Sequence, residues 1–336
     1  MLLEDTSRAP SGACSDCPTS LADRPQMNTT TGSTAPGIPG IWPALLTPLD
    51  AHGAIDHAKF AAHARTLLDA SCGGVTPFGT TGEGPSFSVA ERSAAVDALV
   101  AGGVPAERML VSVSCAALPD TIVLTQQAQR LGAWGVLLMP PFFFKGVSDA
   151  GIVDSYRQVL DAVPDAALRV VLYHIPQISG VALSHGVIGE LLRVYGERIV
   201  AIKDSAGERA HSLALVEAFC GRLGVHVGHE LDLPVLAQRG SRGAVSGLAN
   251  FMPRSVHRMA CEPDPQRSAA DLARVQSLLA WLGGYALIPA LKAIMAAQTG
   301  DAAWLRVRAP LKAVDAERFK TFSRELAAFG LDPGKD

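Results

Sequence analysis

Lys203 and Tyr173 each end an apolar run of the sequence. Lys203 follows Ile199-Val200-Ala201-Ile202, and Tyr173 follows Val170-Val171-Leu172. A lysine at the end of a buried strand either points into a site, where a neutral amine forms an imine with a carbonyl, or lies at the rim beside a carboxylate. Its position alone leaves both interpretations open. A tyrosine at such a place either moves protons to and from a substrate or is a core residue with a satisfied hydroxyl.

A turn of small residues, Gly79-Thr80-Thr81-Gly82, follows another apolar run. Its backbone N–H groups and hydroxyls could hold a carboxylate, although an ordinary turn between a strand and a helix has the same composition. An amine, a proton carrier and a carboxylate cradle at three strand ends suit a reaction through the enamine of a 2-oxo acid. Ser246, at the end of a further run, is a candidate substrate contact.

The elements that must position these residues alternate regularly between residue 41 and about residue 262. Eight apolar runs are predicted as strands, at 41–46, 74–76, 109–113, 135–139, 169–173, 199–203, 224–228 and 243–246. Strands that alternate with amphipathic helices predict a parallel α/β sheet covered on both faces. Eight units in about 220 residues favour a closed (β/α)8 TIM barrel, in which the active site lies at the carboxyl ends of the strands. No G-x-G-x-x-G motif follows a strand, which argues against a dinucleotide fold.

The chain is predicted to have three parts. Residues 1–38 are rich in Ser, Thr, Pro and Gly without periodicity, which predicts a disordered N-terminal arm. Met27 is an alternative start of translation. Cys14 and Cys17 form a single C-x-x-C motif, and a metal site would need a second cysteine pair at a suitable spacing. Residues 39–265 form the predicted barrel. Residues 266–336 form a C-terminal helical region, with helices predicted at 269–282, 285–298 and 313–329.

Composition excludes several classes of protein. The 336 residues carry a net charge of −3, whereas nucleic-acid binding needs a basic face. No apolar run reaches the roughly 18 residues of a membrane span. Six scattered cysteines do not make a disulfide scaffold. We therefore expect a cytoplasmic protein that binds neither membrane nor nucleic acid.

Taken together, the motifs resemble the dihydrodipicolinate synthase / N-acetylneuraminate lyase superfamily, the pyruvate-type class I aldolases. The similarity runs from about Gly40 to Pro333. It is carried, in order along the chain, by Ala44-Leu45-Leu46-Thr47-Pro48 with Gly53-x-Ile55-Asp56, Gly79-Thr80-Thr81-Gly82-Glu83 with Glu91-Arg92, Tyr173-x-x-Pro176, Ile202-Lys203-Asp204-Ser205-x-Gly207, and Lys292 with Arg308-x-Pro310-Leu311.

The resemblance implies a role for each motif. It makes Lys203 the Schiff-base lysine and Tyr173 the proton shuttle, and the loop with Thr80 and Thr81 the holder of the substrate carboxylate. Glu230 aligns approximately with a residue that contacts sugar hydroxyls in the lyases; a solvated carboxylate at a helix start is the alternative. The imine on Lys203 replaces a metal or cofactor, and the assembly implied is a homotetramer, a dimer of dimers.

Departures from the synthase pattern narrow the expected reaction. Where the synthases carry an arginine for the aldehyde's carboxylate, this chain has Ile178, and where they use a second tyrosine it has Phe142-Phe143-Phe144. His174 takes the place of an asparagine. We expect an aldolase or lyase for a 2-keto-3-deoxy sugar acid or a sialic-acid-like substrate, with a small aldehyde as the other partner. The alternatives are 4-hydroxy-tetrahydrodipicolinate synthase of lysine biosynthesis, a sugar-acid dehydratase and, least favoured, a non-enzymatic pyruvate-binding module.

Overall fold

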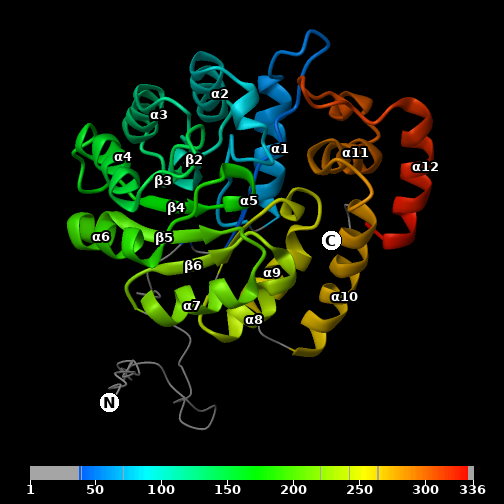
Figure 1. The fold of residues 1–336 in the computed structure, drawn as a ribbon. Coiled ribbons are helices and arrows are strands. Elements are labelled where there is room, and N and C mark those ends of the chain that lie inside the picture. The colour runs from blue at the N-terminus through cyan, green and yellow to red at the C-terminus, as the bar shows by residue number, and fades with distance from the viewer. Residues whose placement is uncertain are drawn as a thin grey trace.

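A parallel sheet of seven strands lies at the centre of the computed structural model, which describes residues 38, 40–70, 72–219, 221–241, 243–262 and 265–331. The strand order is β1-β7-β6-β5-β4-β3-β2 (Figure 1). The strands are Gly40–Pro43 (β1), Leu110–Ser112 (β2), Gly135–Leu138 (β3), Val170–His174 (β4), Ile199–Asp204 (β5), Gly224–Val227 (β6) and Gly243–Ser246 (β7).

The predicted strand at 74–76 closes this sheet into a barrel, although it pairs only through isolated bridges. On one side Thr76 bridges Ala44, and Thr76 N donates to Pro43 O at 2.8 Å. On the other side Val75 bridges Met109, and Val75 N donates to Arg108 O at 2.9 Å. Proline follows at position 77 and offers no N–H, so the segment cannot continue as a regular strand. Eight segments therefore close the ring, as the TIM barrel prediction requires.

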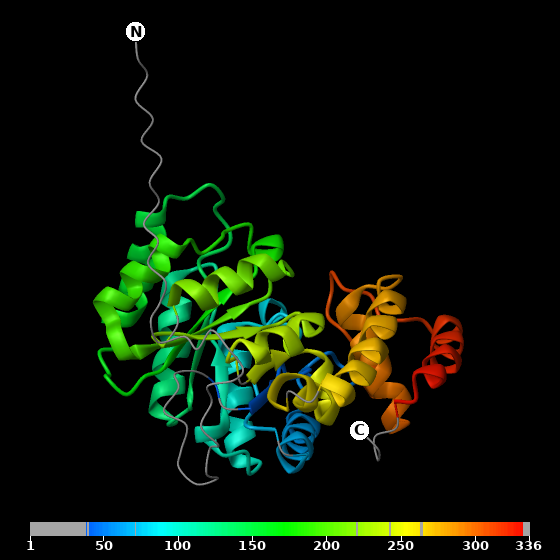
Figure 2. The ribbon, with the colours of Figure 1, turned by 90° about the horizontal axis from the view of Figure 1, so that it is seen from below.

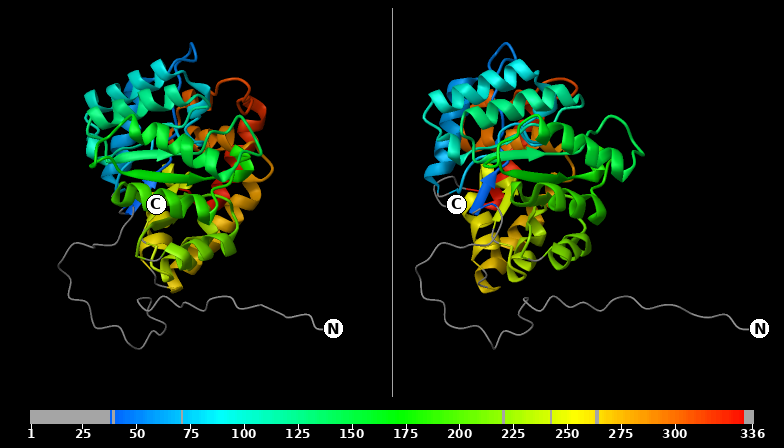
Figure 3. Two further views of the ribbon diagram at one scale, coloured as in Figure 1. Left: turned by 60° about the vertical axis from the view of Figure 1, so that its left-hand side comes forward. Right: turned by 90° about the vertical axis from the view of Figure 1, so that its left-hand side faces the viewer.

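Helices surround the strands on the outside, as Figures 1 and 3 show. They are α1 (His57–Asp69), α2 (Val89–Ala101), α3 (Leu118–Arg130), α4 (Asp149–Asp161), α5 (Pro176–Ser179), α6 (His185–Tyr195), α7 (Arg209–Phe219), α8 (Leu233–Gln238) and α9 (Pro253–Cys261). Several starts are set by capping side chains: Ser88 and Glu91 form a capping box on α2, and Ser184 accepts from Val187 N on α6. The short helix α5 was not predicted.

The two faces of the sheet belong to different apolar clusters. The lumen is filled by one cluster to which most strands contribute, including Trp42, Leu137 and Val171, together with Tyr173. The outer face packs against the helices in a second cluster, which contains Leu172 of the same strand β4. Alternate residues of a strand point to opposite faces, so the position of a residue in its strand decides whether it reaches the lumen.

The C-terminal helices α10 (Pro265–Leu282), α11 (Leu287–Thr299) and α12 (Ala316–Leu326) gather at one side of the barrel (Figures 1 and 2). They share a core with it, because Ile41 and Ala244 of the barrel belong to the same cluster as Leu291 and Phe322. Helix α12 begins after its N-cap Asp315, three residues later than predicted. The C-terminal helical region thus packs as part of the barrel's own core.

The boundary of the predicted arm needs one adjustment. Ile38 is buried, and its N–H donates to Nε2 of His226 at 2.9 Å, so this residue belongs to the barrel. The rest of the arm, with Cys14, Cys17 and Met27, lies outside the described residues.

No single helix in the described ranges is long and apolar enough to cross a bilayer. The segments Ser268–Leu282 and Leu287–Thr299 reach the required length and hydropathy only together, and they are bent by 117° at the break.

Candidate active site

Lys203 and Tyr173 face each other across two neighbouring strands. They are register partners in the pairing of β4 with β5, and the Lys203 Nζ lies 4.3 Å from the centre of the Tyr173 ring. Only 5% of Lys203 and 3% of Tyr173 is exposed. Lys203 therefore points into the barrel mouth, and the interpretation of a rim lysine is excluded.

The loop after the bridging segment brings Thr80 to the same place. The Thr80 Oγ1 and the Tyr173 hydroxyl are 3.2 Å apart, and either can be the donor. Thr81 faces the end of β7, where a Cβ on Gly247 would lie 3.3 Å from its Oγ1. Gly79 is buried, yet a Cβ added there would meet no heavy atom within 4 Å. The structure thus joins the amine, the phenol and the hydroxyl loop, and leaves space beside them.

This loop is held in an unusual backbone shape. Phe78 and Glu83 both have positive φ, 62° and 57°, although neither is glycine. Gly84 is required because a Cβ there would collide with the carbonyl of Phe78. The N–H of Glu83 donates to Thr80 O at 3.1 Å, and the N–H of Gly84 donates to Gly79 O at 3.1 Å. The loop is therefore a tight turn that presents Thr80 and Thr81 in one fixed arrangement.

Ser246 ends β7 and Glu230 follows β6, and the two side chains contact each other. Ser246 is on the same face of β7 as Ala244, which packs against the helices, whereas Val245 belongs to the lumen cluster, so the Ser246 side chain points away from the lumen. Ser246 Oγ donates to Glu230 Oε1 at 2.7 Å, and Leu248 N donates to the same oxygen at 3.3 Å. Glu230 is only 7% exposed, so it is not the solvated carboxylate of the alternative interpretation. One of its oxygens is engaged within the protein, which limits what it can offer to a substrate.

Gly228 is a functional residue that the sequence did not reveal. It follows β6, and a Cβ at this position would lie 3.0 Å from Lys203 Cε and would collide with Ser205 Oγ. The missing side chain leaves room for the lysine stem. A glycine directly after a strand that neighbours Lys203 is the only signal in the sequence, and glycines follow many strands for other reasons.

On the outer face of β4 and β5, His174, Asp204 and His211 form a group whose potential ligand atoms lie within 4.8 Å of one another. The two imidazole rings stack, with centroids 4.5 Å apart and planes 16° apart. An imidazole binds a metal in its ring plane, so two stacked rings cannot direct lone pairs at one ion. His211 Nδ1 donates to Asp204 at 2.9 Å, and His174 Nδ1 accepts from Leu183 N at 3.0 Å. This geometry suits a hydrogen-bonded cluster, and both rings would have to turn to hold an ion.

Two further segments at the rim carry the departures from the synthase pattern. Ile178, on α5, is 60% exposed, and Phe143 and Phe144 are each 72% exposed. The Lys145 ammonium donates to the carbonyls of Phe142 and Ser179, so its charge is used within the rim itself. Neither segment places a tyrosine hydroxyl or an arginine at these positions.

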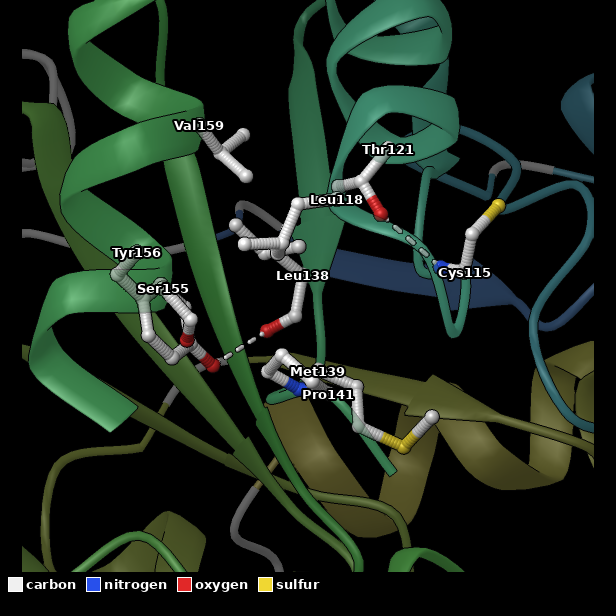
Figure 4. Close-up of a pocket in the computed structure, with 9 residues that line it drawn as sticks. All are labelled: Cys115, Leu118, Thr121, Leu138, Met139, Pro141, Ser155, Tyr156 and Val159. Atoms are coloured by element: carbon white, nitrogen blue, oxygen red, sulfur yellow. Dashed lines mark hydrogen bonds between the residues drawn. The ribbon is translucent and has the colours of Figure 1, made fainter. Parts of the chain in front are cut away.

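A small cavity lies between β3 and the helices α3 and α4, lined by Leu138, Tyr156 and Cys115 among others (Figure 4). Its volume of about 10 Å³ holds one water at most, so it cannot admit a 2-oxo acid. Tyr156, whose hydroxyl donates to Leu138 O at 3.1 Å, is a buried core tyrosine. The cavity is separate from the group formed by Lys203 and Tyr173.

Comparison with known proteins identifies the family. The sequence matches the dihydrodipicolinate synthetase family over residues 38–329. It is 37% identical over 216 residues to an uncharacterised DapA-like lyase of Chloroflexus aurantiacus (64% of this chain, 71% of the relative). It is 31% identical over 215 residues to 4-hydroxy-tetrahydrodipicolinate synthase of Citrifermentans bemidjiense (63% of this chain, 71% of the relative).

The fold comparison agrees. The crystal structure of dihydrodipicolinate synthase from Agrobacterium tumefaciens has a TM-score of 0.80 to this chain at 33% identity, covering 86% of this chain and 99% of that one. The sequence and the fold of this chain therefore both match one family of lyases. The chain belongs to the dihydrodipicolinate synthetase family and is a carbon–carbon lyase of the class I aldolase type.

Proposed function

We propose that this enzyme acts on a hydroxylated 2-oxo acid, a 2-keto-3-deoxy sugar acid or a sialic-acid-like substrate, through an imine on Lys203. The observation that carries the proposal is the contact of three groups at the barrel mouth. Lys203 Nζ lies 4.3 Å from the centre of the Tyr173 ring, and the Tyr173 hydroxyl lies 3.2 Å from Thr80 Oγ1. These are the nucleophile, the acid–base group and part of the carboxylate loop that such a reaction needs.

The reaction begins at the keto carbon. The neutral amine of Lys203 attacks C2 of the 2-oxo acid, and loss of water from the carbinolamine gives a protonated imine. Tyr173 gives its proton to the hydroxyl that leaves the carbinolamine as water, which leaves a phenolate. The C3–C4 bond then breaks, its electron pair forms an enamine with the imine, and the phenolate takes the proton of the C4 hydroxyl. Protonation of C3 and hydrolysis of the imine release pyruvate and regenerate the amine. The imine serves as the electron sink, so we propose that no metal or cofactor takes part.

The carboxylate of the substrate is assigned to the loop from Gly79 to Thr81. Its threonines are half-buried, and Thr80 is linked to Tyr173 by a hydrogen bond. Binding the carboxylate there fixes C2 near the Lys203 amine and converts an encounter into an oriented attack. We assign Glu230, which follows β6, to the hydroxylated half of the substrate, with Ser246 as the hydroxyl that holds its Oε1.

The exposed rim supports a substrate without a second carboxylate. Ile178 stands where the resemblance places an arginine for the carboxylate of aspartate semialdehyde, and an isoleucine offers that carboxylate no charged hydrogen bond. Phe143 and Phe144 offer no hydroxyl for a proton relay. Both features favour a sugar-acid substrate over the semialdehyde.

The second candidate is 4-hydroxy-tetrahydrodipicolinate synthase. It is favoured by the names of two similar proteins, the enzyme of Citrifermentans bemidjiense at 31% identity and that of Agrobacterium tumefaciens at 33%. A sugar-acid dehydratase would use the same imine and stays a third alternative. In all three proposed reactions a 2-oxo acid forms an imine with Lys203. The reactions are therefore distinguished by their products.

The test combines trapping with a substrate panel. Pyruvate and borohydride should label Lys203 covalently, because only an imine is reduced to a stable amine. Lys203→Arg should give no adduct, since a guanidinium stays protonated. The panel compares pyruvate release from 2-keto-3-deoxy acids and sialic acid with condensation of pyruvate and aspartate semialdehyde.

Each outcome has a clear meaning. A label on another lysine, or none, would overturn the mechanism. Faster condensation with the semialdehyde than cleavage of any sugar acid would overturn the substrate class and favour the synthase. Formation of a dehydrated 2-oxo acid without pyruvate release would favour the dehydratase. We further propose a cytoplasmic homotetramer, and light scattering of the purified protein measures its mass directly.

A further inference from the structure

A second buried lysine, Lys292 of α11, approaches the carboxylate loop from the C-terminal helical region. Its ammonium forms an ion pair with Glu83 Oε1, and neither side chain has any exposed surface. The ammonium also donates to Arg306 O at 2.7 Å. Burial lowers the pKa of Lys292, and the Glu83 carboxylate opposes that shift. An ion pair this deep is costly to desolvate, so its position beside the loop calls for an explanation.

Glu83 is part of the loop that we assign to the substrate carboxylate. It sits three residues after Thr80, with φ of 57°, and its own N–H closes the turn onto Thr80 O at 3.1 Å. Such a left-handed residue with a side chain persists only where its surroundings hold it. The carbonyl of the same Gly82–Glu83 peptide is held as well, since Thr47 Oγ1 donates to Gly82 O at 2.7 Å. The ion pair with Lys292 is thus the side-chain anchor of the strained residue.

The segment after α11 adds further contacts to the same loop. Arg308 N donates to Glu83 Oε2 at 3.3 Å, and the Arg308 guanidinium donates to Ser86 O at 3.0 Å. The guanidinium also pairs with Glu91 of α2, with Nη1 3.1 Å from Oε2, and lies over the Phe87 ring. The C-terminal region therefore binds both carboxylate oxygens of Glu83 and also contacts the residues that follow the loop.

We propose that Glu83 and Lys292 are positioning residues that set the affinity of the site for the substrate carboxylate. They act through the backbone of the loop, which places the hydroxyls of Thr80 and Thr81. The inference rests on the proposed function, because it takes the loop as the carboxylate site. It gives the C-terminal helical region a part in substrate recognition, although none of its residues reaches Lys203.

The test uses the concentration dependence of imine trapping by the full-length enzyme. Cyanoborohydride reduces the imine, and the initial rate of adduct formation on Lys203 is measured against the concentration of pyruvate and, separately, of hydroxyacetone. Hydroxyacetone is a ketone of similar size without a carboxylate. The variants are Glu83→Gln, which keeps the shape and removes the charge, and Lys292→Met. The control is Asp271→Asn, which weakens the partly buried ion pair of Asp271 with Arg258 between α9 and α10.

We expect Glu83→Gln and Lys292→Met to raise the half-saturating concentration of pyruvate by about 10- to 100-fold, the usual effect of disturbing one hydrogen bond to a charged group. The value for hydroxyacetone should change less than about threefold, and so should both values in Asp271→Asn. If the variants instead disturbed Lys203 itself, the half-saturating concentrations of pyruvate and hydroxyacetone would rise together. A pair that only stabilises the fold would lower the melting temperature and leave both values unchanged.

Either of those two results overturns the positioning role. The proposed function fails in a different way, because the wild-type enzyme would then show no adduct with pyruvate at all. If Lys292→Met does not fold, Glu83→Gln decides the matter alone, since the Lys292 amine can still donate to the new amide oxygen and to Arg306 O. A pyruvate-specific change in that variant supports the role, and an unchanged value contradicts it.

Discussion

The same two strands carry two polar clusters, one on each face. On the lumen face of β4 and β5, Tyr173 and Lys203 lie side by side, and within the described residues their side chains share one hydrogen bond with the protein, between the Tyr173 hydroxyl and Thr80 Oγ1. One residue further along each strand, His174 and Asp204 point to the helices. Asp204 accepts from His211 at 2.9 Å, from Ser212 Oγ at 2.7 Å and from Ala206 N at 3.1 Å.

Under the proposed function, this difference distinguishes side chains that act on a substrate from side chains that hold the fold together. The carboxylate of Asp204 is saturated by protein donors from α7 and from its own loop, so it serves to dock that helix on the strand. The lumen pair lies beside open space at Gly79 and retains donors and acceptors that protein atoms do not satisfy within the described barrel mouth. Burial is nearly equal on both faces, so burial alone does not mark a reactive residue.

Replacing Tyr173 by Phe should have the largest effect and should appear in turnover. Loss of an acid–base group commonly lowers kcat by about 10² to 10⁴. The fold should tolerate the change, because the phenyl ring stays in the lumen cluster. The measurement is kcat with a saturating substrate from the panel.

Tyr156→Phe is the matched control for that variant. It removes a hydroxyl that is also buried but bonded to Leu138 O, away from the lumen. Its kcat should stay within about twofold while the free energy of unfolding falls by about 1 kcal/mol. Equal kcat losses in both variants would show that the lumen face has no special role.

Asp204→Ala should act chiefly on stability. Its carboxylate has three protein donors and is almost fully buried, so its removal should lower the free energy of unfolding by about 2–5 kcal/mol. We expect kcat to fall by less than about tenfold, as the change lies on the face opposite to Lys203. Urea unfolding and steady-state turnover measure the two effects. A kcat loss as large as that of Tyr173→Phe would show that the outer cluster is also needed for turnover, which would contradict the distinction between the two faces.

Buried histidines, of which His174 is the one on the outer face of β4, should also make folding depend on pH. Burial lowers the pKa of His174, and Asp204 opposes this, while His211 and Glu208 are the other charges around it. Burial lowers the pKa of His63 and of His226 to about 4. Between about pH 6.5 and these lower values the unfolded chain binds more protons, so the free energy of unfolding must fall as the pH falls.

For His63 and His226 this amounts to about 2 kcal/mol each between pH 7 and pH 5. His174→Asn should remove part of the slope, measured by urea unfolding at several pH values. Tyr173→Phe should leave the slope unchanged, because it removes no histidine. A slope that is unaltered by His174→Asn would mean that this histidine titrates alike in the folded and unfolded chain.

The parts of the site that could be predicted from sequence are those set by strand position. Lys203 and Tyr173 end apolar runs, and in a parallel barrel such ends meet at one mouth, so their contact follows from the topology. Gly228 and Lys292 contribute to the site because they lie close to residues that are distant in the sequence, Gly228 to Lys203 and Lys292 to Glu83. No local pattern encodes such an approach, and Lys292 was noted only through the family resemblance.

The strand at 74–76 shows a similar limit for the fold. Its apolar residues predicted a strand, and it does occupy the eighth place in the ring, but Pro77 and the left-handed Phe78 reduce it to two bridges. The same distortion shapes the carboxylate loop that follows. The sequence predicted a regular strand. The structure instead has a short bridging segment, whose left-handed Phe78 starts the tight turn with Thr80 and Thr81.

The smallest effect should come from the N-terminal segment, residues 1–37. Deleting residues 1–37 should leave the melting temperature and the trapping of pyruvate nearly unchanged, because this composition buries little apolar surface. The deletion must stop before Ile38, whose N–H donates to Nε2 of the buried His226. Ile38→Ala in the shortened chain should then cost about 2–5 kcal/mol of unfolding free energy, as for other buried isoleucines. A loss above about 2 kcal/mol from the deletion alone would show that the segment docks on the barrel or on a neighbouring subunit, and the comparison of the two faces would then have to include it.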